Sequence, residues 1–315
     1  MSDTAGVLVV GDTTIDLYPT DDAPITDGSA FEWHVGGTAA NVARWLAELG
    51  DDATIVTNVG TDTAGEMAAR HLDASPVQTH RVARIDGISP LTLYVPTADG
   101  DHWDAWVRES CYGFTPPGDP ESLVAPYDWV QLEGVTLPET VNGSAVRDLA
   151  EAAHERGTAV AFDLNGRRNQ WESSEAYRRA LRDVLPYCSM VFAGTADLMV
   201  ADIDPTPSGL CDCLPADHSG VAFLTDGASP TVGLHIRDGA VVERVAVPPP
   251  SVSVATPAGA GDAFAAGVLA ARRRGVSELR ELVTIGNAAG AAAVTTPEPF
   301  TSDIVAPVTE ALDDA

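Results

Sequence analysis

The chain has 315 residues and a formal net charge of −28, and this excess of acid excludes nucleic acid and anionic membranes as partners. All 18 basic residues are arginines, which also excludes chemistry that needs a lysine: a Walker A loop, a protein-kinase strand lysine or a Schiff base. An acidic surface without lysine is typical of halophilic proteins, since molar salt screens self-repulsion. We therefore expect structure to be lost in dilute buffer.

Cysteine usage and hydropathy favour a cytoplasmic protein. Cys111 and Cys188 are isolated, and Cys211 and Cys213 lack the two-residue spacing of a zinc knuckle. Neither a secretory signal nor an apolar run of membrane-spanning length is evident. We expect a cytoplasmic enzyme without a disulfide framework.

Short apolar runs alternate with helical patterns along the chain, which favours a largely parallel sheet with helices on both faces. The predicted strands are Val7–Val10, Thr54–Val56, Trp129–Leu132, Ala159–Phe162, Met190–Phe192 and Val221–Leu224. The predicted helices lie near residues 38–49, 62–72, 142–156, 174–184, 260–274 and 277–294. The expected fold is a three-layer α/β/α sandwich, as a single domain over residues 1–315.

Two regions break this rhythm and predict a small separate β-sheet. Phe31–Val35 alternates with period two, and Ile88–Val95 with His102–Arg108 reads as a hairpin. These strands belong to no βαβ unit, so we assign the small sheet to about residues 14–36 and 88–112. Its aromatic residues, Trp103 and Trp106, either stack on a ligand or pack a dimer interface.

Two glycine turns lead into alanine-rich helices and carry the strongest functional signal. Gly36 and Gly37 precede one helix, and residues 259–261 (Gly-Ala-Gly) precede another that has Asp262 in its first turn. Helix N-termini present unpaired amides and positive potential, which suits phosphate. Asp262 would repel such an anion, but it fits a hydroxyl that loses a proton as it receives a phosphoryl group. The alternative is an acid that merely complements the helix dipole, and that dipole is expected to lower its pKa.

These motifs, with the buried strand that runs into the polar turn at residues 11–16, resemble the PfkB (ribokinase-like) family of ATP-dependent carbohydrate kinases. The resemblance extends from about residue 7 to about residue 296. It implies a ribokinase-like fold with the small sheet as a lid, ATP and Mg²⁺ as cofactors and a small sugar as substrate. The free edges and exposed aromatic residues of such a lid suggest a homodimer formed through it.

The sugar is expected at the carboxyl end of the first strand, where ligands of open α/β sheets bind. Asp12 and Asp16 fall there, although Asp12 is equally suited to forming the turn. The resemblance implies that Asp16 reads sugar hydroxyls, with Gly36, Gly37 and Asn41 in the same pocket.

A second strand end carries the pattern Asp-x-Asn-x-Arg at residues 163–167. It resembles the fructokinase and 2-keto-3-deoxygluconate kinase branch. Arg167 then meets the substrate or the transferred phosphate, because a guanidinium suits oxyanions; the alternative is a surface arginine. Arg108 stands where sugar-acid kinases of this branch carry a substrate arginine. Two arginines favour a keto sugar or a sugar acid over ribose.

On the nucleotide side, the resemblance implies Thr225, Gly227 and Asn287, with Asn287 near the adenine. The amides of Gly259, Ala260 and Gly261 stabilise the transferred phosphoryl group, and Asp262 is the general base. The family's usual Asp-Thr is replaced by Thr256-Pro257, which puts a monovalent-cation site in doubt. Its metal-associated Asn-x-x-Glu is reduced to Gly194–Asp197, where Asp197 orients water around Mg²⁺.

The prediction is therefore a sugar kinase, with fructose and 2-keto-3-deoxygluconate favoured as substrates. Two alternatives stay open: a catalytically weak sensor of the same fold, and a ribokinase or nucleoside kinase. A dinucleotide-dependent oxidoreductase is disfavoured, because Phe264 stands where its fingerprint needs a third glycine.

Overall fold

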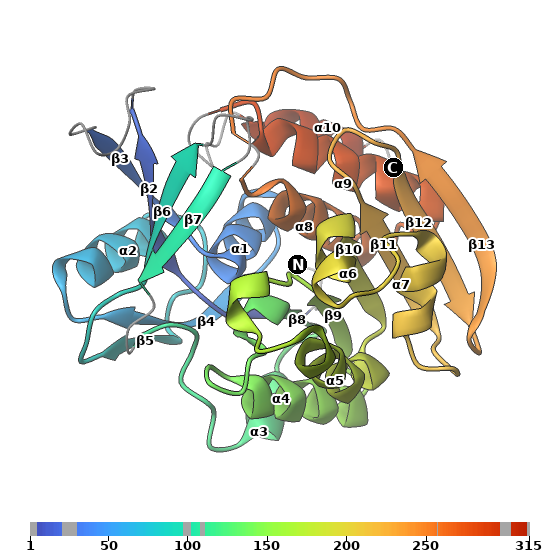
Figure 1. The fold of residues 1–315 in the computed structure, drawn as a ribbon, viewed down its shortest axis with the longest axis horizontal. Coiled ribbons are helices and arrows are strands. Elements are labelled where there is room, and N and C mark those ends of the chain that lie inside the picture. The colour runs from blue at the N-terminus through green and yellow to red at the C-terminus, as the bar shows by residue number, and fades with distance from the viewer. Residues whose placement is uncertain are drawn as a thin grey trace.

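A nine-stranded, mostly parallel sheet runs through the middle of the molecule (Figure 1). The computed structural model describes residues 5–20, 30–96, 102–107, 111–256, 258–296 and 304–313. In sheet order the strands are β13 (Ala240–Val247), β12 (Thr231–Arg237), β11 (Gly220–Thr225), β10 (Met190–Gly194), β9 (Ala159–Asp163), β8 (Trp129–Glu133), β1 (Val7–Val10), β4 (Ala53–Gly60) and β5 (Val82–Ile85). Only β12 runs against its neighbours among these strands, and the prediction of a mostly parallel sheet is confirmed.

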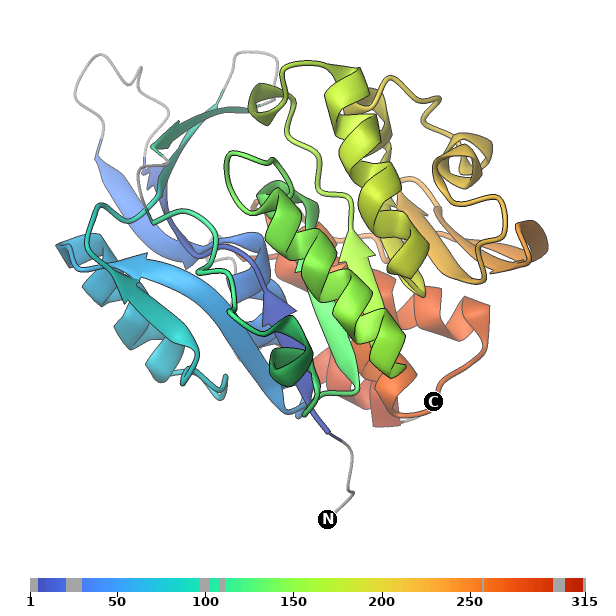
Figure 2. The ribbon, with the colours of Figure 1, turned by 90° about the horizontal axis from the view of Figure 1, so that it is seen from below.

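Helices cover both faces of this sheet, because the strands are apolar on both sides. Val7 and Val9 of β1 face one core, and Leu8 and Val10 face the other. The first core is covered by α1 (Thr38–Glu48), α8 (Ala260–Arg273), α9 (Leu279–Ala293) and α10 (Ala306–Asp313). Figure 2 looks onto the opposite face, which carries α3 (Pro120–Val124), α4 (Gly143–Arg156), α5 (Ser174–Val184), α6 (Thr195–Val200) and α7 (Pro207–Cys213).

A separate four-stranded sheet stands beside the main one (Figure 1). Its order is β3 (Phe31–Gly36), β2 (Thr14–Pro19), β6 (Leu91–Pro96) and β7 (His102–Val107). Ile15 and Val35 anchor it by packing on Val59 of β4 and Ala68 of α2 (Thr63–Asp73). The small sheet was thus predicted from the period-two pattern. Arg108 and the side chains of Trp103 and Trp106 lie outside the described residues.

Every predicted strand and helix of the main body is present, and most begin and end within one or two residues of the predicted bounds. The largest difference is at β4, which continues to Gly60 although the predicted strand ends at Val56. The sequence did not predict β5, β12, β13, α3, α6, α7 or α10. These are short or peripheral elements. Among the described residues, no helix is both long and apolar enough to cross a bilayer.

The helices differ in how their first turns are closed. The first turns of α2, α3, α5 and α7 are closed by side chains, from Asp62, Asp119, Ser173 and Thr206 respectively. In contrast, α1 and α8 begin at Gly37 and Gly259, whose φ values of 100° and 77° favour glycine. Neither N-cap residue closes the first turn with a side chain, which is also true of α4 and α9. In α1 the amides of Ala39 and Ala40 bond Asp12, whereas the first amides of α8 remain available to a ligand.

Candidate active site

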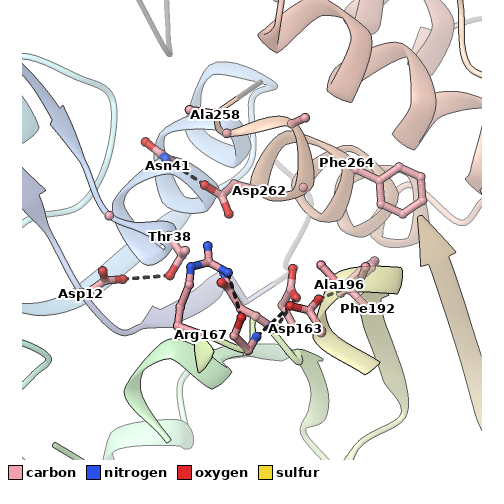
Figure 3. Close-up of a pocket in the computed structure, with 18 of the residues that line it drawn as sticks. Asp12, Thr38, Asn41, Asp163, Arg167, Phe192, Ala196, Ala258, Asp262 and Phe264 are labelled. Atoms are coloured by element: carbon pink, nitrogen blue, oxygen red, sulfur yellow. Dashed lines mark hydrogen bonds between the residues drawn. The ribbon is translucent and has the colours of Figure 1, made fainter. Parts of the chain in front are cut away.

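A cavity of about 500 Å³ lies at the carboxyl ends of β1, β9 and β10. The small sheet forms one wall, and the N-termini of α1 and α8 form another (Figure 3). Most of the predicted site residues line it: Asp12, Asp16, Gly37, Asn41, Arg167, Asp197, Thr225, Gly259, Ala260, Gly261 and Asp262. Chain segments from residue 12 to residue 264 therefore meet in one space, as parallel-sheet topology requires.

Asp12 and Asp16, the two carboxylates that come after β1 in the chain, are both buried at the cavity. Asp12 accepts hydrogen bonds from Thr38 Oγ1 (2.8 Å) and the Ala39 amide (3.5 Å), so it holds the start of α1 while facing the cavity. Asp16 accepts one from Thr14 Oγ1 (2.7 Å). Gly36 was predicted to line the pocket, but it lies next to Asp16 and does not line the cavity. A Cβ at Gly36 would overlap the Asp16 carboxylate, which explains why this position is a glycine.

Asp262 projects from the first turn of α8 into the same cavity. Its Oδ2 accepts a hydrogen bond from Asn41 Nδ2 (2.8 Å), which joins the N-termini of α8 and α1 (Figure 3). Its other oxygen accepts no hydrogen bond from the described residues. A Cβ at Gly261 would meet nothing within 4 Å, so the backbone beside Asp262 is open to a ligand.

The prediction that the helix N-terminus lowers the pKa of Asp262 is wrong. Burial raises its pKa from 3.8 to about 7; Asn41 and Arg167 oppose this rise, and Asp12 adds to it. Desolvation outweighs the dipole because the side chain is only 7% exposed. The carboxyl therefore titrates near neutral pH, where a general base is most effective.

Arg167 projects into the cavity near Asp262 of α8 (Figure 3), and its guanidinium interacts electrostatically with Asp262 and with Asp197 of α6. Burial alone would lower the pKa of its guanidinium, but Asp197 and Asp262 reverse this and the net shift is upward. Its only hydrogen bond to the described residues is to the carbonyl oxygen of Gly166 (3.3 Å). The guanidinium is thus held in the cavity by charge, with donors left for an anionic ligand.

Asp197 accepts hydrogen bonds on both oxygens. The amide of Gly166 donates to Oδ1 (2.8 Å), and that of Gly194 donates to Oδ2 (2.7 Å). It thereby ties the loop after β9 to the end of β10. Burial raises its pKa, and Arg167 opposes the rise.

A second cavity, of about 380 Å³, adjoins the first and contains the remaining predicted nucleotide residues, Gly227 and Asn287. The two cavities share four lining residues: Thr225, Ala260, Gly261 and Phe264. The second is largely apolar, lined by Val252, Val254, Ala291 and Val294 among others. Both ends of the Asn287 amide are engaged, since Oδ1 accepts from Thr231 Oγ1 (2.7 Å) and Nδ2 donates to the Val247 carbonyl (3.0 Å).

Several cavity residues were not predicted. Tyr18 and Tyr94 stack at 4.4 Å between ring centroids and line the first cavity. Alternation along β2 places Tyr18 on the same face as Asp16, and this pattern was a usable signal. Phe192 and the 249–254 loop carry no local pattern, because strand order alone brings them to the site. Asp163 and Asn165 also line the first cavity.

The cavity walls carry a strong excess of negative charge. Asp12, Asp16, Asp163, Asp197 and Asp262 face a single guanidinium among the described lining residues. No cluster of three or more His, Cys, Asp or Glu side chains able to hold a metal ion occurs in the described part of the chain. This donor set suits a hydrated divalent cation that uses few protein ligands.

Comparison with known proteins gives a consistent result along the whole chain. The model of the pfkB family carbohydrate kinases matches residues 4–304. Similar curated proteins include an aminoimidazole riboside kinase of Salmonella typhimurium (27% identical; 94% of this chain, 91% of the relative) and a fructokinase of Klebsiella pneumoniae (28%; 84% and 83%). A 2-dehydro-3-deoxygluconokinase of Dickeya dadantii is 27% identical (87% and 90%). The solved structure of a fructokinase with bound ATP from Xylella fastidiosa superposes with a TM-score of 0.80 at 21% identity, over 98% of this chain and 99% of that one.

Proposed function

Since the chain belongs to the pfkB family of carbohydrate kinases, we propose that it transfers the γ-phosphoryl group of ATP to a hydroxyl of a small sugar or sugar acid. The observation that carries this proposal is the pair of joined cavities at the N-terminus of α8. One is polar and lined by carboxylates, and the other is apolar. An acceptor with many hydroxyls suits the first, and a nucleobase suits the second.

The phosphoryl group crosses at the wall that the cavities share. Ala260 and Gly261 belong to both linings, so a nucleotide in the apolar cavity reaches the polar one past the start of α8. The amides of residues 259–261 and the positive end of the helix stabilise charge on the transferred oxygens. Arg167 adds a guanidinium fork on the opposite side of the cavity.

Asp262 accepts the proton of the attacking hydroxyl. Asn41 fixes one carboxylate oxygen, which leaves the other directed to the acceptor. Because burial raises its pKa to about 7, the group is a stronger base than an exposed aspartate and is still largely ionised above neutral pH. Phosphoryl transfer has a loose transition state, so this positioning contributes more than basicity does.

The donor set fits the magnesium ion that accompanies ATP in such reactions. When bound, Mg²⁺ neutralises charge on the phosphate oxygens. Asp197 would hold the ion through water, since both of its oxygens already accept hydrogen bonds from backbone amides.

For the acceptor we favour fructose or 2-keto-3-deoxygluconate, in line with the fructokinase and 2-dehydro-3-deoxygluconokinase relatives. Asp12 and Asp16 suit bridging hydroxyls, the Tyr18–Tyr94 stack suits a sugar face, and Arg167 suits a keto or carboxylate oxygen. The aminoimidazole riboside kinase relative supports a riboside as the alternative.

The test is ADP release from MgATP in molar KCl, across fructose, 2-keto-3-deoxygluconate, ribose, glucose, adenosine and aminoimidazole riboside. Turnover with one of the first two supports the favoured class, and turnover with a riboside replaces it. Ligand binding with no turnover on any acceptor supports a sensor of the same fold.

Assembly and environment stay proposals. The edge strands β3 and β7 of the small sheet, with Trp33 48% exposed on β3, suit a homodimer formed through a lid. A halophilic source and a cytoplasmic location follow from composition alone. Light scattering of the purified protein in molar KCl measures the oligomeric state.

A further inference from the structure

The end of β9 brings two oxygen ligands into the cavity that the reaction described above does not use. Asp163 is 8% exposed and Asn165 is 6% exposed, and both line the cavity. Asp163 Oδ1 accepts a hydrogen bond from the backbone amide of Asn165 (3.0 Å). The side-chain oxygen of Asn165 is buried and has no hydrogen-bond partner among the described residues. A buried polar atom without a partner is costly, so an absent ligand is the natural explanation.

The backbone at Asn165 is also unusual. Its φ is +35°, and it is one of three residues other than glycine with positive φ in the described chain. Asparagine tolerates this region better than most residues, although glycine would adopt it at lower cost. An asparagine here is therefore not explained by backbone conformation.

The end of the neighbouring strand β10 provides fewer free ligand atoms for a metal ion. Gly194 has no side chain, and both Asp197 oxygens are engaged by the amides of Gly166 and Gly194. By contrast, Asp163 Oδ2 accepts no hydrogen bond from the described residues. Asp163 also shares the cavity with the carboxylates of Asp197 and Asp262, and this concentration of negative charge favours a nearby cation.

We propose that Asp163 and Asn165 are the direct protein ligands of the divalent metal ion that accompanies the nucleotide, with Asp197 acting through water. This inference rests on the proposed function. A carboxylate and an amide oxygen are hard ligands of the kind that Mg²⁺ takes, and phosphate oxygens and waters complete its shell. The Asp-x-Asn spacing at the end of a strand places both groups at the same cavity wall.

The test measures Mn²⁺ binding to the protein–ADP complex by electron paramagnetic resonance, with ADP affinity measured separately in EDTA. Asp163→Asn and Asn165→Gly are each expected to weaken Mn²⁺ binding at least about tenfold and to leave ADP affinity in EDTA unchanged. Asn165→Gly relieves the positive φ, so its Tm is expected to equal or exceed that of the wild type. A residue with a merely structural role would not show this combination.

Asp226→Asn is the matched control. Asp226 is an exposed carboxylate that follows β11, two strands away from β9 in the sheet. It accepts a hydrogen bond from Thr195 Oγ1 (2.8 Å) and does not line the cavity. Its substitution removes one negative charge from the same edge of the sheet and is expected to leave Mn²⁺ affinity unchanged.

Three results would overturn the assignment. An Mn²⁺ affinity within about twofold of wild type in both variants would exclude Asp163 and Asn165 as ligands. A loss of ADP affinity in EDTA as large as the loss of Mn²⁺ affinity would exclude them as well. Loss of Mn²⁺ binding in Asp197→Asn alone assigns the metal to Asp197. A wild-type protein that binds no ADP, with or without metal, contradicts the proposed function itself.

Discussion

Replacing Asp262 by asparagine is expected to abolish turnover and to stabilise the protein at the same time. The variant keeps the shape of the side chain and an oxygen that can accept the Asn41 hydrogen bond. It removes the proton acceptor, so kcat is expected to fall by about 10²–10⁴-fold. It also removes a charge that the fold buries at a cost.

The size of the stabilisation follows from the raised pKa. A rise from 3.8 to about 7 corresponds to about 4 kcal/mol, as an upper limit. Below pH 3.8 the carboxyl is neutral in the folded and unfolded states, and the cost is absent. The cost grows as the pH rises from 3.8 towards 7, because only the unfolded state releases the proton there. It is full above pH 7.

Thermal unfolding at pH 4, 6 and 8 in molar KCl checks this dependence. Relative to wild type, the variant's Tm is expected to be nearly equal at pH 4 and higher by roughly 5 °C at pH 8. Asp52→Asn, at an exposed carboxyl, is the control and is expected to give no such trend. A variant with near-normal kcat, or one less stable than wild type at pH 8, would refute the reasoning.

Four further predictions follow, three on the cavity and one on the salt dependence of the fold. Arg167→Met removes a positive charge that lowers the pKa of Asp262. The value of kcat/KM should therefore fall, and the pH at which kcat/KM reaches half of its maximum should move above about 7. An unchanged midpoint would contradict the electrostatic interaction between Arg167 and Asp262. Gly261→Ala fills open space at the phosphate wall, so it should lose at least about tenfold in kcat with no loss of Tm. Gly259→Ala, at a φ of +77°, should instead cost about 1 kcal/mol in stability. The acidic, lysine-free chain should unfold on dialysis into dilute buffer, and a native circular dichroism spectrum there contradicts a halophilic adaptation.

Local patterns predicted the fold, and most of the residues that they proposed for the site line one cavity. The glycine turn before α8 has a physical reason that is visible within a few residues, namely a helix N-terminus with open amides. The alternation of β3 likewise predicted the small sheet. The features that the sequence could not predict depend on residues that are far apart in the chain and adjacent in the fold.

The pKa of Asp262 is the clearest case. Its helix position is local, but its burial at the cavity and its distances from Asp12 and Arg167 depend on how the sheet brings distant segments together. Asp163 and Asn165 were visible in their motif, yet nothing local indicated that the amide oxygen of Asn165 lacks a partner. The apolar second cavity depends on the 249–254 loop, whose proline-rich sequence predicted only a loop.

The central claim is that this cavity transfers a phosphoryl group to a sugar hydroxyl with Asp262 as base. The most direct measurement compares ADP released with phosphorylated acceptor formed, by mass spectrometry, for wild type and Asp262→Asn in molar KCl. We expect one phosphorylated acceptor per ADP with fructose or 2-keto-3-deoxygluconate, and loss of both products in the variant. ADP formed without a phosphorylated acceptor, or equal yields from both proteins, would contradict the account.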